Sequence, residues 1–135
     1  MARTVKAMIE RASDGRYSVY MDADDMDYQV TGTGATADEA VKVFMGGYED
    51  TKKYYEEEGK PFEEVSFSFV YDVPSFLSYY SSILSLAGLS RVTGINQGQL
   101  SHYVTGRRTP SAATVQKIQQ AVHTLGNELS EVHFA

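Results

Sequence analysis

The chain has 135 residues, of which 42% are hydrophobic and 22% are charged, a composition typical of a globular protein with one large or two small domains. It contains no cysteine, which excludes disulfides and thiolate metal sites. It shows neither a signal segment nor an apolar run long enough to cross a membrane, so we expect a cytoplasmic protein that makes no membrane contact.

The net charge of −6 is distributed unevenly along the chain. Residues 1–72 carry eight Lys and Arg against sixteen Asp and Glu, whereas residues 73–135 carry four against two. Electrostatic attraction acts over a Debye length of about 8 to 10 Å, so a mildly basic C-terminal part can approach an anionic partner while the acidic part faces away. Because the positive surplus is only two charges, one copy of the chain offers a weak electrostatic footprint to nucleic acid, and dimerisation would double it.

Alternating segments begin the chain and predict a small sheet. Residues 4–11 and residues 17–21 each alternate between apolar and polar side chains, and a Ser-Asp-Gly turn signal at 13–15 lies between them. These segments predict a hairpin, and a third strand is expected at residues 28–33.

An acidic segment, residues 22–27, holds four carboxylates and begins with the D-x-D spacing of a calcium-binding loop. It lacks glycine at the sixth position, and Thr33 stands where such a loop carries glutamate. We therefore expect a solvated acidic loop, or a docking surface for a basic partner, rather than a metal site. His123 and His133 also lack partners at a ligating spacing, so neither a metal nor a cofactor is predicted.

A long helix is predicted over residues 36–58, followed by a strand over 65–71. Thr36 and Glu39 have the spacing of a capping box, and apolar residues then recur every three or four positions. Gly46-Gly47 in the middle indicates close backbone approach to the sheet, or a bend. The order β-β-β-α-β implies a small α+β layer.

Residues 1–72 resemble the HicB antitoxin family. The resemblance rests on a D-G-x-Y-S-V hairpin at residues 14–19, a G-x-G-x-T turn at 32–36 and a T-x-x-E-A-V helix start at 36–41. It implies a partial RNase H-like layer without nuclease activity, often followed by a DNA-binding segment. It also implies a small basic RNase toxin of HicA type as the partner that this part of the chain binds and covers.

Two short helical patterns separated by Gly94-Ile95-Asn96 form the centre of the C-terminal part. In the second pattern Asn96 is a plausible N-cap, and an apolar side faces inward. The opposite side is uncharged and suits base edges in a major groove. The candidate base-contacting residues on that side are Gln97, Gly98, Ser101 and His102.

Gly106 is expected to end this helix, and two arginines and a hydroxyl follow it. A helix lying in the groove would bring these groups past the phosphates. The candidate phosphate-contacting residues are Asn96, Arg107, Arg108 and Thr109. The alternative is a plain helical hairpin whose polar side chains are only solvated.

The segment from residue 85 to residue 126 resembles the helix-turn-helix of the Cro and phage-repressor (XRE-type) family. The matched positions are Gly94, Asn96, Leu100-Ser101-x-Tyr103, Gly106-Arg107-Arg108-x-Pro110-Ser111, Thr114, Lys117-Ile118, Ala121 and Leu125-Gly126. The resemblance implies an all-α bundle that binds a double-stranded DNA operator as a homodimer or a higher oligomer.

These patterns predict two domains, residues 1–72 and residues 73–135, joined at Pro74. The last helix is expected to begin after Ser111 and to end before Gly126, and residues 131–134 alternate like a further strand.

The favoured function is a transcriptional regulator that acts as the antitoxin of a HicAB-like pair and represses its own operon. The alternative is a stand-alone repressor whose N-terminal domain only dimerises or senses a ligand. A third possibility is a nuclease with RNase H-like chemistry, which would need carboxylates converging on strand centres to hold Mg²⁺. The strand interiors lack them, so no catalytic residue is predicted.

Overall fold

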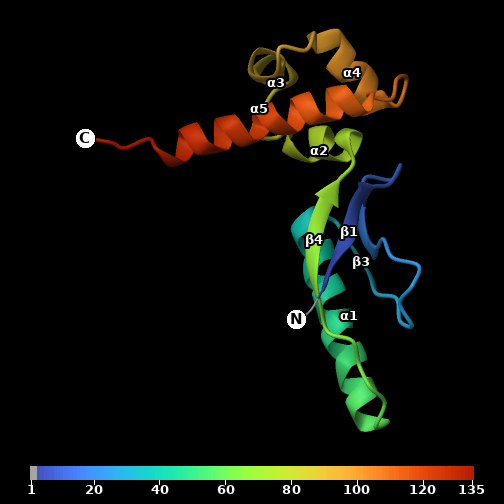
Figure 1. The fold of residues 1–135 in the computed structure, drawn as a ribbon. Coiled ribbons are helices and arrows are strands. Elements are labelled where there is room, and N and C mark those ends of the chain that lie inside the picture. The colour runs from blue at the N-terminus through green and yellow to red at the C-terminus, as the bar shows by residue number, and fades with distance from the viewer. Residues whose placement is uncertain (1–2) are drawn as a thin grey trace. The chain divides into compact units, whose positions relative to one another are not determined.

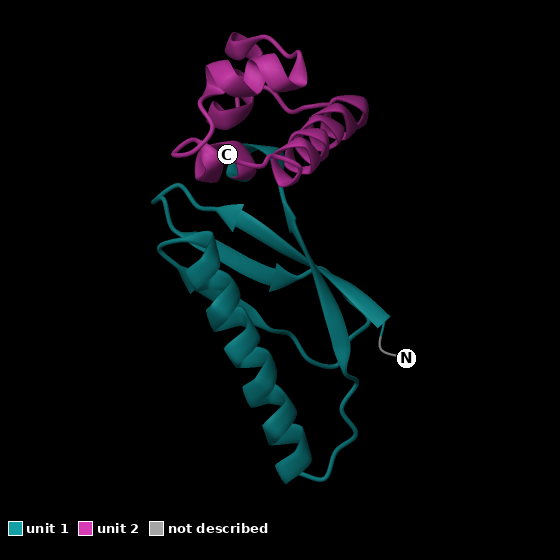
Figure 2. Cartoon of the chain, turned by 90° about the vertical axis from the view of Figure 1, so that its left-hand side faces the viewer, with its two compact units in different colours: residues 1–75 teal, residues 76–135 magenta. Residues whose placement is uncertain are grey.

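The structure is a computed structural model that describes residues 3–135. The chain divides into two compact units, residues 1–75 and residues 76–135 (Figure 2). The first unit holds the strands and one long helix, and the second holds only helices, so the fold is mixed α and β as expected. The elements in chain order are β1 (Arg3–Arg11), β2 (Tyr17–Met21), β3 (Thr31–Gly34), α1 (Ala37–Glu57), β4 (Val65–Tyr71), α2 (Val73–Tyr80), α3 (Leu86–Thr93), α4 (Gln97–Thr105) and α5 (Ala112–Ser130).

The sheet of the first unit has the strand order β3-β2-β1-β4. β1 and β2 form the predicted antiparallel hairpin, and β3 continues it on the far side of β2. β4 returns parallel to β1, in an unbroken register from Arg3 opposite Val65 to Ile9 opposite Tyr71. Such a parallel return needs a crossover connection, which α1 supplies.

α1 lies along one face of the sheet, and the alternation of the strands follows from this contact (Figure 1). The apolar positions predicted for β1 and β2 are buried and the intervening positions are more exposed. On the helix, Phe44 is fully buried, and its ring meets the ring of Phe67 edge to face at 4.8 Å. The first turn is capped as predicted, because Thr36 Oγ1 accepts a hydrogen bond of 3.1 Å from the Glu39 N–H.

Close backbone approach between α1 and the sheet occurs mainly at β3, and less at the predicted Gly46-Gly47. A Cβ built on Gly32 would lie 2.4 Å from the Phe44 nitrogen, and one on Gly34 would lie 2.6 Å from the Glu39 Cβ. The expectation for Gly46-Gly47 is correct only in part. A Cβ on Gly47 would lie 3.2 Å from Val30 Cγ1, whereas one on Gly46 would meet nothing within 4 Å.

The third strand begins at Thr31, three residues later than predicted. Residues 28–30 lie outside the sheet, and Tyr28 is buried by aromatic packing instead, stacked on Phe62 at 4.8 Å. Its hydroxyl donates a hydrogen bond of 2.7 Å to the main-chain oxygen of Glu63. Tyr28 and Val30 are both buried, two positions apart, which is the spacing of buried residues in a strand. Neither residue lies in the sheet, however.

The acidic loop is not purely solvated. Arg3 lies 2.8 Å from Asp25 and 2.8 Å from Glu63, so one guanidinium joins β1, the loop and the segment before β4. The hydrogen bond from Arg3 lowers the pKa of Asp25 below its ordinary value. All three side chains are substantially exposed, and such pairs contribute little to stability.

α2 begins within the last residues of the first unit. Asp72 Oδ1 accepts a hydrogen bond of 3.1 Å from the Ser75 N–H, and Ser75 Oγ accepts one of 2.7 Å from the Arg11 N–H. The buried Ser75 hydroxyl therefore ties the helix start to the end of β1.

In the second unit, α3 packs against both α4 and α5, around Leu89, Leu100 and Ile118, which are buried. Ser111 Oγ caps α5 by accepting from the Thr114 N–H at 3.2 Å, as predicted.

Two expectations for the C-terminal end are wrong. α5 continues through Gly126 to Ser130, because a glycine in open space only weakens a helix and does not end it. Residues 131–135 form no strand, and Phe134 is 93% exposed. None of the helices over residues 3–135 combines the length and apolar character that crossing a membrane requires.

Candidate nucleic-acid interface

The turn between α3 and α4 is held by a short set of hydrogen bonds. Gly94 adopts a left-handed conformation with φ of 73°, which ends α3 and lets the chain reverse. Ser90 Oγ donates 2.6 Å to the Ile95 carbonyl, and the Ile95 N–H donates 3.2 Å to Thr93 Oγ1. These bonds hold the turn against the end of α3, and α4 then packs on α3 through apolar contacts.

Asn96 caps α4 as predicted. Its Oδ1 accepts hydrogen bonds from the Gly98 N–H at 2.8 Å and from the Gln99 N–H at 3.4 Å. The carboxamide oxygen is therefore occupied, while the nitrogen of the same group is a donor that can face a phosphate at the helix N-terminus.

The predicted two-sidedness of α4 is present. Leu100 and Tyr103 are buried on one side. On the other side Gln97 and Gly98 are exposed, whereas Ser101 and His102 are half-buried. The four residues predicted to contact bases are thus not equally accessible, and the N-terminal end of α4 is the most open part of the face.

Gly98 and His102 differ from the other two. The Gly98 N–H is already used by the cap, and a Cβ at this position would lie 3.0 Å from Asn96 Oδ1, so Gly98 offers a surface without a free donor. The His102 Nδ1 atom is buried and has no hydrogen-bond partner among residues 3–135. Of the His102 ring nitrogens, therefore, only Nε2 is a candidate for contact with a base.

The turn after α4 presents the predicted cations. Gly106 is left-handed with φ of 79° and ends the helix, and the Arg108 N–H donates 3.3 Å to the His102 carbonyl. The side chains of Arg107, Arg108 and Thr109 are exposed. No carboxylate of the described chain lies within ion-pair distance of either guanidinium, so both are available to an anion.

Lys117 adds a cation that the sequence analysis treated only as part of a family pattern. Its Cε and Nζ atoms would lie 3.9 Å from a Cβ on Gly94, so the α5 side chain reaches the turn that precedes α4. The lysine and its position in the helix could be read from the sequence, but its proximity to this turn depends on the packing of α5 against α3.

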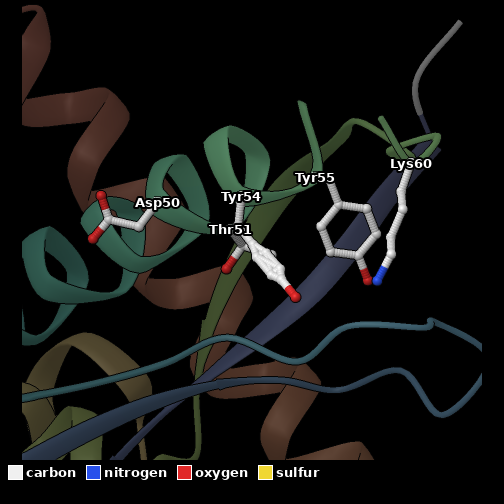
Figure 3. A pocket seen from close by; sticks show the side chains of 5 residues that line it. All are labelled: Asp50, Thr51, Tyr54, Tyr55 and Lys60. Atoms are coloured by element: carbon white, nitrogen blue, oxygen red, sulfur yellow. The ribbon is translucent and has the colours of Figure 1, made fainter. Parts of the chain in front are cut away.

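A surface hollow lies at the C-terminal end of α1, lined by Asp50, Thr51, Tyr54, Tyr55 and Lys60 (Figure 3). The Lys60 ammonium lies 5.6 Å from the centroid of the Tyr54 ring, a cation–π distance. No group of three or more His, Cys, Asp or Glu side chains able to hold a metal occurs within residues 3–135.

Comparison with known families finds a match within the second unit. Residues 81–123 match the helix-turn-helix family model, a span that contains α3, α4 and most of α5. The match agrees with the predicted XRE-type segment and supports a DNA-binding transcription regulator. No curated protein and no solved structure matches the chain significantly. The HicB resemblance of the first 72 residues finds no support in these comparisons and stays a prediction.

Proposed function

We propose that this chain is a sequence-specific DNA-binding regulator in which α4 enters the major groove of an operator. The observation that carries the proposal is an α4 with an uncharged, exposed N-terminal end and two unpaired guanidiniums just after its C-terminal end, within a segment that matches the helix-turn-helix family. Base edges need hydrogen-bonding groups, whereas phosphates need positive charge, and the segment supplies the two kinds separately.

The contacts divide accordingly. Gln97, Ser101 and His102 hydrogen-bond to base edges, and Gly98 allows the helix to approach the groove closely. Asn96, Arg107, Arg108 and Thr109 hold the phosphates. Two copies of the chain bind two half-sites, since a single unit with a net charge of +2 has a small electrostatic footprint.

Substitutions at the two kinds of residue test this division. Gln97→Ala should relax the preference at one base pair by roughly 1 to 3 kcal/mol and leave other positions unchanged. Arg107→Ala should weaken all sequences alike and reduce the slope of log affinity against log salt by about 1. Affinity is measured by fluorescence anisotropy on an operator selected from a random library.

Matched controls are available on other parts of the chain. Gln120 on α5 and Arg16 in the first unit are exposed and lie outside the proposed interface, so their alanine variants should bind like the native chain. A uniform loss of affinity from both Gln97→Ala and Arg107→Ala, with no change in base preference, would refute the proposed roles.

We further propose that the chain is the antitoxin of a HicAB-like pair, in which the first unit binds a small basic RNase toxin. The support is the surplus of acidic residues in residues 1–72 together with the HicB-like motifs. Glu56 and Glu57 add to it, because acids in the last turn of a helix oppose the dipole of α1 and no basic residue offsets them there. A stand-alone repressor whose first unit only dimerises or senses a ligand is the competing function.

A further inference from the structure

β4 lies at one edge of the sheet. Within the described residues the sheet ends at β4, which pairs with β1 on one side. The opposite edge, β3, has only four residues, two of them glycines that lie with one face against α1. β4 has seven residues, so the two edges differ strongly in the length of backbone they expose.

β4 also lacks the features that normally protect an edge. Natural edge strands carry lysine or proline, contain a bulge, or are short, because an open edge pairs with other strands. β4 has the sequence VSFSFVY, without charge or proline, and its register with β1 has no bulge. Ser66 and Ser68 are exposed, and Phe69 is 38% exposed although it lies on the face that α1 covers.

We propose that β4 pairs antiparallel with β4 of a second copy, about a twofold axis through Ser68, and forms one continuous sheet of eight strands. The choice of a second copy as the occupant rests on the proposed function, because binding two half-sites needs two chains. The axis is normal to the sheet, so each residue keeps its face and both α1 helices lie on the same side.

The sequence of β4 is self-complementary in this register. Ser68 lies opposite its own copy, and Phe67 lies opposite Phe69 of the second copy on the α1 side, an aromatic pair of the kind that stabilises sheets. The seven strand residues all find partners and none is charged. The next pair outward would bring Glu64, which is paired with Lys52, opposite Asp72, so the uncharged pairing ends with the strand itself.

The absence of native cysteine makes a register-specific cross-link possible. In an antiparallel pair, opposite Cα atoms lie about 4.5 to 5.5 Å apart, which suits a disulfide, so Ser68→Cys should give an oxidised dimer. Ser66→Cys on the same strand would lie about 13 Å from its copy and should not cross-link. Thr33→Cys, exposed on the same face at the β3 edge, is the second control.

Sedimentation of the full chain without DNA gives an independent measurement. The native chain should be dimeric, and Ser68→Lys should raise the dimer dissociation constant roughly tenfold or more by opposing two like charges at the axis. Thr33→Lys should leave the constant unchanged. A monomeric native chain, equal cross-linking at residues 33 and 68, or a dimer unaffected by Ser68→Lys would each overturn the proposal, the last indicating another surface such as the exposed end of α5.

Operator binding separates this inference from the proposed function. If the chain cross-links through residue 68 but selects no DNA sequence, the β4 dimer is supported and the proposed regulator function is refuted. If the chain binds an operator but fails the cross-linking and sedimentation tests, the proposed function is supported and the β4 dimer is refuted.

Discussion

The Asn96 side chain restricts which residue can occupy position 98. The Asn96 carboxamide caps α4 through the Gly98 N–H, and a side chain at residue 98 would press on the same oxygen. The cap could be predicted because residue type and position before a helix are enough to indicate it. The burial of His102 Nδ1 could not, since it depends on atoms that only the folded chain brings together.

Tyr28 is a second residue whose behaviour depends on its surroundings. Burial raises its pKa to about 12, and the charges of neighbouring acidic and phenolic groups act in the same direction. The folded chain therefore favours the neutral phenol. Its contribution to stability is complete below pH 10, the ordinary pKa, and is lost as pH rises through about 12.

We expect the free energy of unfolding to fall between pH 10 and about 12, with Tyr28 accounting for roughly 2 to 3 kcal/mol at most. Urea unfolding at several pH values measures this slope. Tyr28→Phe keeps the stacked ring and removes the titrating group, so the slope of the variant should be smaller. Equal slopes in the native chain and the variant would show that Tyr28 ionises like an exposed tyrosine.

At the scale of elements, the packing of α1 on β3 predicts that alanine has opposite effects on stability at Gly32, which faces α1, and at Gly46, which is in open space. Gly32→Ala should lower the free energy of unfolding by about 1 to 3 kcal/mol or more, because its Cβ would collide with main-chain atoms of α1. Gly46→Ala should raise it by about 1 kcal/mol, since the site is open and alanine favours the helix. Denaturation midpoints of the two variants measured side by side provide the check, and a destabilised Gly46→Ala would contradict this account.

How far the sequence predicts an element depends on whether local signals define it. β1, β2, β4, and the starts of α1, α4 and α5 agree with the sequence because alternation, turns and caps mark them. The start of β3 was misplaced because burial of Tyr28 among aromatic rings imitates strand alternation. The end of α5 was misplaced because Gly126 can lie inside a helix or after it, and the sequence does not distinguish the two.

The local structure of the candidate site could be predicted because caps and turns mark it in the sequence. The Asn96 cap, the two sides of α4 and the exposed arginines follow from the sequence between two glycines. The proximity of Lys117 to Gly94 and the unequal exposure of the four predicted base-contacting residues arise from packing between helices.

For the whole molecule, the uneven charge distribution assigns the two proposed partners to different parts of the chain. The first 72 residues carry the acidic surplus, and the remainder carries the basic surplus and the helix-turn-helix match. Each partner of the proposed regulator therefore meets the part of the chain that attracts it, and neither requires the net charge of the whole chain to change sign.

The antitoxin proposal predicts that a short, basic reading frame adjoins the gene and that its product co-purifies with this chain. Replacing Glu56, Glu57 and Glu58 with Gln should weaken that complex and make it less sensitive to salt, because the attraction of an exposed acidic helix end is screened. The same variant should be nearly as stable on its own, since the change relieves repulsion with the dipole of α1 and removes only the weak, exposed attraction between Glu56 and Lys52. Pull-down at increasing salt compares the two chains, with Arg107→Ala as the control that should retain the partner. A gene without such a neighbour, or a chain that captures no product from it, would favour the stand-alone repressor.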